Sequence, residues 1–397
     1  MTLLKTPGVA RLIGAQLTAR FPFGMLALCL LIHIEDVFDS YAAAGLVLAA
    51  MSIGQGIAGP LTSRLMGRLG MRPVLIVTMV VCTLAVVTLA LAPMSIVGLM
   101  IVGFIAGLSM PPVQPAVRTI YPKIVNSRQL TPLFSLDASA QEIIWVLGPV
   151  IATFVSIQIS GAAGILLAAV FLVVGGTWFV ALPEVGRVRI PRSRRKFGVV
   201  LKKPAVLLST IVGFMLLAAC AALEAGVVAA FGHGSANSGW VLGIFAVGSL
   251  VGGLALGHRP IGPWALSSRM LVVTVGLAVA SLSLNFWWLS GSLILAGIGI
   301  APSFAVLFGI VSASVKFSDT AEAYGWVGTG QLIGAALGSA LAGFSIDHSG
   351  ATAALYVAAG FAALGSIIAA LGRRWHPDLR GRDASPIPDT EPISVVS

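Results

Sequence analysis

Four ionisable side chains lie inside long apolar tracts of this sequence. Arg20 is in the first tract, Asp137 and Glu142 are in a tract over 131–158, and Glu224 follows in a later one. A charged side chain at the centre of a membrane costs at least about 2.5–3.5 kcal/mol on insertion scales. If these tracts span a membrane, the four residues are the first candidates for ion coupling or substrate binding.

Glu142 and Arg20 are expected at a similar depth, roughly 15 Å from one membrane face at 1.5 Å per helical residue. A buried carboxylate is charged beside a cation, whereas burial without a partner favours its neutral form. A Glu142 that alternates between these two environments would carry a proton, with Arg20 as its charge partner. The alternatives are a static pair of Arg20 with Glu142 or Asp137 that holds two spans together, and direct contact with a substrate.

Asp137 is expected nearer the membrane surface, within reach of Arg118 or Arg128, so a structural ion pair and proton coupling both fit it. Glu224 has no basic residue in its own span or the neighbouring ones, so it should be protonated or face water. Proton coupling, binding of a cationic substrate and the lining of a wet cavity all fit Glu224. Four uncharged residues are further candidates for a cavity wall, with simple packing as the alternative: Gln55, Gln114, Trp145 and Gln331.

The composition indicates an integral membrane protein. Of the 397 residues, 57 % are apolar and only 10 % are charged, against roughly 25 % charged in an average globular chain. The net charge of +10 sits in short clusters between apolar tracts, unlike the basic faces of nucleic-acid-binding proteins. Three cysteines in apolar tracts exclude a disulfide framework. We find no phosphate-binding loop and no metal-spaced Cys/His cluster, so we expect neither an enzyme nor a cofactor or metal.

Charge-free runs and the turns between them predict twelve transmembrane helices. Their expected ranges are 10–33, 41–63, 74–92, 95–117, 131–158, 162–182, 205–230, 237–257, 270–286, 289–311, 323–346 and 351–371. With both termini in the cytoplasm, 23 of the 24 Lys and Arg residues fall on the inner side, and only Arg20 does not. This bias follows the positive-inside rule. We therefore expect a multi-pass protein of the inner (plasma) membrane with cytoplasmic termini, in contact with anionic lipid.

A basic segment divides the spans into two halves that resemble each other. Residues 183–204 contain eight Lys or Arg residues. Three glycines recur at an offset of 194 residues, Gly45, Gly54 and Gly59 as Gly239, Gly248 and Gly253. Six spans followed by six in the same orientation are typical of rocking transporters with a central substrate site. The expected units are an N-terminal six-helix bundle (1–182), a cytoplasmic basic linker (183–204), a C-terminal six-helix bundle (205–371) and a disordered cytoplasmic tail (372–397).

The loop after the second expected span reads Ser63-Arg64-Leu65-Met66-Gly67-Arg68-Leu69-Gly70-Met71-Arg72-Pro73. With the span count and the repeat, it resembles the Gly-x-x-x-Asp-Arg-x-Gly-Arg-Lys/Arg motif of the major facilitator superfamily, most closely its drug/proton antiporter branch. In the family, this loop latches the cytoplasmic side closed, so the resemblance implies a gating loop of Arg64, Arg68, Gly70 and Arg72. Gly67 replaces the family's Asp, which leaves the arginines to bind lipid or a helix C-terminus.

A second motif, Gly148-Pro149, matches the Gly-Pro that marks exporters in this family, and the proline is expected to bend its helix. The resemblance implies two pseudo-symmetric six-helix bundles and alternating access. We expect a monomer that exports small amphipathic or drug-like molecules against proton entry, with Glu142 and Glu224 as the titrating groups. One alternative is a proton-coupled importer in which Arg20 binds a substrate carboxylate. Another is a transport-inactive receptor or scaffold on the same fold.

Overall fold

The structure is a computed structural model that describes residues 6, 8–193, 195–232, 235–257, 259–381 and 384–389. The remaining residues lie outside the described part, and they belong to the two expected termini, the basic linker and two loops. Eleven helices in the described part are long and apolar enough to cross a membrane, and one further apolar helix, Ala265–Ala280, is shorter. The predicted all-α membrane fold with twelve spans is confirmed.

The described residues form fifteen α-helices and three short 3-10 helices. They are α1 (Val9–Arg20), α2 (Pro22–Phe38), α3 (Tyr41–Leu69), α4 (Met71–Leu91), α5 (Ile96–Leu108), α6 (Val113–Ile124), α7 (Ser127–Gln158), α8 (Gly161–Ala181), α9 (Pro183–Arg187), η2 (Val199–Lys202), α10 (Pro204–Phe231), α11 (Ala236–Leu256), α12 (Ala265–Ala280), α13 (Phe286–Ser314), η3 (Phe317–Asp319), α14 (Thr320–Ser349), α15 (Ala351–Leu371) and η4 (Gly372–Trp375). The first span consists of α1 and α2, and the fourth of α5 and α6, which are separated where Pro111 and Pro112 supply no backbone N–H.

The ninth span begins earlier than the sequence indicates. We expected it over 270–286, after the charge of Arg269, whereas α12 begins at Ala265 and ends at Ala280. The Arg269 side chain is buried within the helix and donates from Nη1 to the carbonyl oxygen of Pro302, at 3.0 Å. A satisfied guanidinium can lie inside a span, so its charge does not mark the end of the helix.

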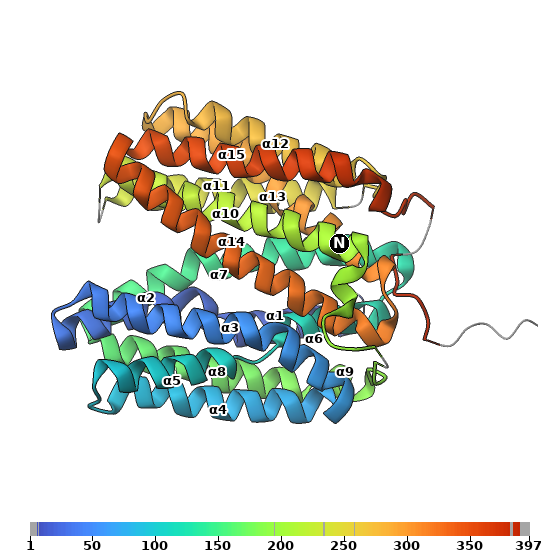
Figure 1. The fold of residues 1–397 in the computed structure, drawn as a ribbon, viewed down its shortest axis with the longest axis horizontal. Helices are drawn as coiled ribbons and strands as arrows, with labels where there is room; N and C mark the ends of the chain where they lie inside the picture. Colours follow the sequence, from blue (N-terminus) through green and yellow to red (C-terminus); the bar gives the residue numbers. More distant parts are fainter. Residues whose placement is uncertain are drawn as a thin grey trace, which may run out of the picture.

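Figure 1 shows α1–α6 and α8 on one side of the molecule, α10–α13 and α15 on the other, and α7 and α14 running between them. Repeat-related glycines have the same packing role in both halves. Gly54 of α3 lies against the backbone of α5 near Phe104, and Gly248 of α11 lies against the backbone of α13 at Ile294. A residue without a side chain lets spanning helices approach closely, so the sequence repeat corresponds to a repeated helix pair.

The two halves are in contact at one end of the molecule, which we call the basic end because it carries Arg64, Arg72 and the linker. Here α3 contacts α14, and α7 contacts α11 and α13. Ser135 of α7 donates to the carbonyl oxygen of Gly253 at 2.7 Å, and Gly325 of α14 lies against the backbone of α3. Toward the other end α3 and α14 diverge (Figure 1). The structure is therefore closed at the basic end.

The tail is not disordered over its described residues. Leu379 is buried, and its backbone N–H donates to the carbonyl oxygen of Ile261 at 2.9 Å. Farther along, Ile387 forms a parallel β-bridge with Lys316. The expectation of disorder is wrong for this part of 372–397, because the buried Leu379 side chain and backbone hydrogen bonds of Ile387 attach it to the loops of the basic end.

A glycine that matches the exporter motif is required by packing. A Cβ at position 148 of α7 would lie 2.8–2.9 Å from backbone atoms of Gly24 in α2, and two helix backbones cannot yield as a side chain does. We expect Gly148→Ala to lower the free energy of unfolding by about 1–3 kcal/mol. Thermal unfolding of the purified protein in detergent, followed by tryptophan fluorescence, measures the effect.

The matched control for this prediction is Gly343→Ala in α14, where an added Cβ meets nothing within 4 Å. An unobstructed Gly→Ala change in a helix is neutral or stabilising, by roughly 0.5–1 kcal/mol. Equal midpoints for the two variants would contradict the packing role of Gly148.

Candidate functional site

A cavity of about 160 Å3 lies between the two halves, next to their contact at the basic end. All four uncharged residues that the sequence suggested for a cavity wall line it: Gln55, Gln114, Trp145 and Gln331. They come from α3, α6, α7 and α14, so both halves contribute to the wall. The side chain of Arg20 reaches the same cavity from α1.

The cavity wall combines amide and hydroxyl groups with aromatic and aliphatic surface. Its other members include Phe23, Thr62, Met110, Gln141, Leu217, Tyr324, Thr329 and Leu332. Among the described lining residues, Arg20 is the one side chain that is ionised at neutral pH. The amide nitrogen of Gln331 is buried and has no hydrogen-bond partner within the described part of the chain. A buried donor without a partner is costly, so an acceptor that reached the amide of Gln331 would satisfy it.

Arg20 lies beside Asp137, as one of the alternatives from the sequence has it, and not beside Glu142. Its guanidinium donates to the amide oxygens of Gln16 at 2.8 Å and Gln141 at 2.5 Å. The carboxylate near it belongs to Asp137, with Arg20 Nη1 at 3.6 Å from Oδ1. The expected pairing of Arg20 with Glu142 is not found among the ion pairs of the described residues. The two carboxylates lie on different faces of α7, and depth along the helix does not reveal which face turns toward α1.

Asp137 is the centre of a fully buried polar cluster. It accepts hydrogen bonds from Gln16 Nε2 at 2.9 Å, Arg118 Nε at 3.1 Å and the Tyr121 hydroxyl at 3.1 Å. The predicted contact with Arg118 is therefore present. However, Arg118 was expected at the end of its span among the inner loop charges, whereas it lies within α6 and is 2 % exposed. Because burial separates it from water, its charge depends on Asp137 for compensation.

The other two carboxylates lie apart from this cluster. Glu142 accepts a hydrogen bond from Ser249 of α11 at 3.0 Å, across the contact between the halves. Glu224 of α10 is exposed and follows the cavity-lining Leu217 by seven residues, which places both on one face of the helix. Neither Glu142 nor Glu224 forms an ion pair with any described residue.

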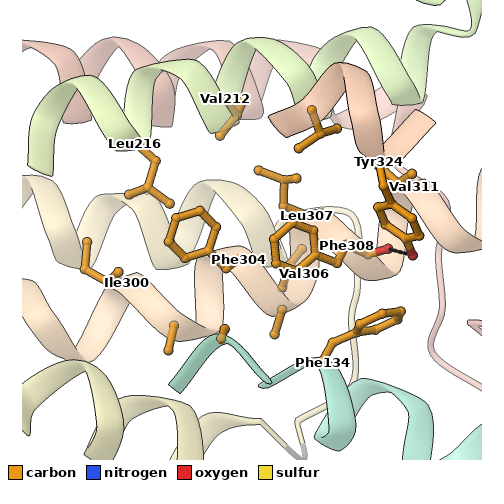
Figure 2. Packing of buried hydrophobic residues seen from close by; sticks show 14 of the residues in the cluster. Phe134, Val212, Leu216, Ile300, Phe304, Val306, Leu307, Phe308, Val311 and Tyr324 are labelled. Atoms are coloured by element: carbon orange, nitrogen blue, oxygen red, sulfur yellow. Dashed lines mark hydrogen bonds between the residues drawn. The ribbon is translucent and has the colours of Figure 1, made fainter. Parts of the chain in front are cut away.

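An aromatic cluster closes the space between the cavity and the basic end. Phe134 of α7 lies near Phe308 of α13 and Tyr324 of α14, with ring centroids 6.4 and 6.5 Å away. Figure 2 shows the three rings together and the hydrogen bond from the Tyr324 hydroxyl to the carbonyl oxygen of Phe308. The guanidinium carbon of Arg118 lies 3.3 Å from the Phe308 ring centroid. The buried cluster of one half is thus attached to the seal formed with the other half.

An ion pair between the halves lies at the basic end. Arg64 Nη1 of α3 is 2.5 Å from a carboxylate oxygen of Glu322 in α14, and both side chains are largely buried. The other oxygen of Glu322 accepts from the backbone N–H of Gly198 in the linker at 2.8 Å. Asp319 binds the linker as well, through Ser193 at 2.6 Å and Arg195 at 3.6 Å. We call Arg64, Glu322, Asp319 and these linker contacts the latch.

The loop after α3 therefore takes part in the latch contacts although Gly67 replaces the acidic residue of the family motif. Arg64 takes its acidic partner from the other half of the protein. Arg72 donates to the carbonyl oxygens of Val180 and Leu182, both at 3.1 Å, at the C-terminal end of α8, as the alternative of helix C-terminus binding predicts. Gly70 has φ +93° between α3 and α4, a conformation that favours glycine. Arg68 is exposed and forms no ion pair with a described residue.

Three functional candidates were missed in the sequence, and each left a signal. Gln16 precedes Arg20 by four residues and Gln141 follows Asp137 by four, so each shares a helix face with a charge. Glu322 lies at the start of an apolar span, where an unpaired carboxylate is costly, so its presence there indicates a partner. An amide or carboxylate within one turn of a membrane charge is thus an indicator that sequence reading can use.

Comparison with known proteins agrees with this architecture. The family model described as Major Facilitator Superfamily matches residues 12–284 and, in a second match, residues 222–394. A search of curated protein sequences finds no match. The chain is similar to the crystal structure of the human organic anion transporter MFSD10 (TETRAN), with a TM-score of 0.70 and 15 % identity over 91 % of this chain and 100 % of that one.

Two further solved structures are similar to the same extent. A bacterial homologue of the iron transporter ferroportin in the outward-facing state gives a TM-score of 0.71 at 14 % identity, and the fucose:proton symporter FucP of E. coli gives 0.71 at 13 %. Each comparison covers 92 % of this chain and 98 % of the other. At these identities, the similarity establishes a shared fold.

Proposed function

Because this chain belongs to the Major Facilitator Superfamily, and is thus a membrane transporter and not an enzyme, we propose that it exports small amphipathic or drug-like molecules in exchange for protons. The observation that carries this proposal is the cavity between the halves, which combines neutral polar groups with aromatic surface. Such walls suit amphipathic ligands. We assign the chain to the drug/proton antiporter branch on its loop and Gly148-Pro149 motifs.

In this proposal, the basic end faces the cytoplasm, together with both termini, and the protein acts as a monomer. The bias of Lys and Arg toward that end supports the orientation. The contact at the basic end then closes the cavity on its cytoplasmic side. Rocking of the two halves would break the latch and the aromatic cluster and make contacts at the opposite end.

Glu142 is the proposed main proton carrier, and Glu224 is the second. The hydrogen bond between Glu142 and Ser249 joins α7 to α11 and therefore joins the two halves. When the halves rock, the carboxyl group exchanges this partner for another environment, and its affinity for a proton changes with it. Proton binding and conformation are coupled in this way, since a ligand shifts the equilibrium toward the state that binds it better.

The test uses proteoliposomes with an imposed pH gradient, a panel of drugs and metabolites, and a pH-sensitive dye inside the vesicles. We expect Glu142→Gln to reduce substrate-dependent proton flux at least about tenfold, in the range of a lost proton-transfer group. Substrate binding should remain, because Glu142 does not line the cavity. Glu224→Gln is expected to weaken coupling in the same assay.

The matched control is Asp347→Asn, an exposed carboxylate at the other end of the molecule, which should leave the flux unchanged. Full coupling in Glu142→Gln would contradict the assignment of that residue. If the substrate moves only toward the basic end, in the same direction as protons that flow down their gradient, the protein is an importer. The absence of any substrate-dependent proton flux in the wild type would support a scaffold.

A further inference from the structure

The polar cluster beside the cavity has more positive than negative charge. It contains two guanidinium groups, from Arg20 and Arg118, and one carboxylate, from Asp137. Guanidinium groups remain protonated in proteins. No other carboxylate forms an ion pair with either arginine among the described residues. The cluster therefore has a formal charge of +1 in a place shielded from water.

One carboxylate cannot neutralise both arginines, and Arg20 is the one of the two that lies on the cavity wall. Asp137 lies 3.1 Å from Arg118 and 3.6 Å from Arg20, so it faces both guanidinium groups but accepts a hydrogen bond only from Arg118. Arg118 also faces the ring of Phe308, and the side-chain amide oxygen of Gln114, in the orientation that satisfies both groups, accepts from it within 2.8 Å. The close partners of Arg20 are two neutral amide oxygens. Amide oxygens satisfy hydrogen-bond donors but do not neutralise a charge.

The same side chain lies on the cavity wall, where no described residue contributes a carboxylate. The amide of Gln331 adds a buried N–H donor without a partner, and Gln55 adds a second amide group to the wall. A buried cation with unused donors nearby is best satisfied by an anionic group that enters the cavity. The apolar part of the wall, with Phe23 and Trp145, suits a hydrocarbon or aromatic body attached to that group.

From these contacts we infer that the substrates are amphipathic organic anions whose anionic group binds Arg20 with help from the Gln331 amide. This inference rests on the proposed function, because it takes the cavity as the transport site. It narrows the substrate class by charge. A neutral analogue lacks the compensating charge, and an amine brings a second cation to Arg20.

The test measures binding of matched probes to the purified full-length protein by titration calorimetry. Phenylpropionate, phenylbutyrate and naphthylacetate are each compared with the corresponding amide and amine. We expect each carboxylate to bind at least about tenfold more tightly than its amide, in the range of a charge-assisted hydrogen bond, and each amine to bind more weakly still. The comparison within the wild type does not depend on any variant that could fail to fold.

Variants then assign the preference to Arg20. Arg20→Gln should bind carboxylate and amide within about twofold of each other, whereas Arg20→Lys should keep most of the preference because it keeps the charge. Arg374→Gln removes an exposed arginine that does not line the cavity and should behave as wild type. Equal binding of carboxylates and amides by the wild type, tighter binding of amines, or an unchanged preference in Arg20→Gln would overturn the inference.

The inference and the proposed function fail in different experiments. If the carboxylates bind with the expected preference but their transport moves no protons, proton-coupled export fails and the anion site stands. If protons move with neutral or cationic compounds and Arg20→Gln has no effect on selectivity, the anion site fails and the coupling stands.

Discussion

Asp137→Ala is expected to be the most destabilising single substitution in this protein. It removes the carboxylate that accepts from Gln16, Arg118 and Tyr121 and leaves two buried guanidinium groups without a counter-charge. Breaking a buried ion pair by removing one partner costs about 3–5 kcal/mol. We expect little folded protein in membranes, measured as the fraction that is monodisperse after detergent extraction, and a strongly lowered unfolding midpoint in what remains.

The control for this effect removes one negative and one positive charge together. In Asp137→Leu combined with Arg118→Met, the carboxylate and its closest guanidinium are both replaced by apolar groups, and much of the loss should be recovered because replacing a buried pair is often close to neutral. The cluster still contains Arg20, with its two amide partners. A double variant as unstable as Asp137→Ala would show that the shape of the network matters more than its charge.

Glu322→Gln is expected to shift the protein away from the conformation closed at the basic end. The substitution removes the negative charge that Arg64 faces at 2.5 Å and weakens the acceptor for the linker N–H of Gly198. A change of about 1–3 kcal/mol in this equilibrium alters the ratio of states by roughly 5–150-fold. The protein should remain folded, because the pair joins the two halves and does not hold either half together.

Cysteine labelling can measure this shift. Ser135→Cys, in a background with the three native cysteines replaced, puts a thiol at the contact of α7 with α11, where Ser135 binds the carbonyl oxygen of Gly253. A membrane-impermeant maleimide added from the basic end should react at least several-fold faster in Glu322→Gln. Arg68→Gln is the control, because Arg68 is exposed in the same loop and has no ion-pair partner in the described part of the chain.

A charge exchange makes the second test of the latch. Arg64→Glu combined with Glu322→Arg restores opposite charges across the contact and should return the labelling rate toward that of the wild type. If Glu322→Gln labels at the wild-type rate, the aromatic cluster of Phe134, Phe308 and Tyr324 closes the basic end by itself.

Much of the architecture was predictable from the sequence because membrane insertion depends on local composition. A run of about 20 apolar residues is apolar in any arrangement of the helices, so the twelve spans and the fold class followed directly. The four neutral residues proposed for a cavity wall all line one cavity. Exposure of a polar side chain to lipid is costly, so a polar side chain deep in a span faces the protein interior. In a protein of two helix bundles, that interior includes the cavity between them.

The tertiary structure alone decided which groups are partners. Counting residues gives the depth of a side chain along a span but not the direction in which it points around the helix axis. Depth therefore could not decide between Glu142 and Asp137 as the partner of Arg20, and the structure shows that it is Asp137. The latch joins Arg64 to Glu322, 258 residues away, and no local pattern encodes the meeting of α3 with α14. In the same way, Leu379 and Ile387 have docking sites only after the loops of the basic end have come together. Partner choice depends on packing over the whole chain, because the free energy of a buried charge is set by whichever groups the fold places around it.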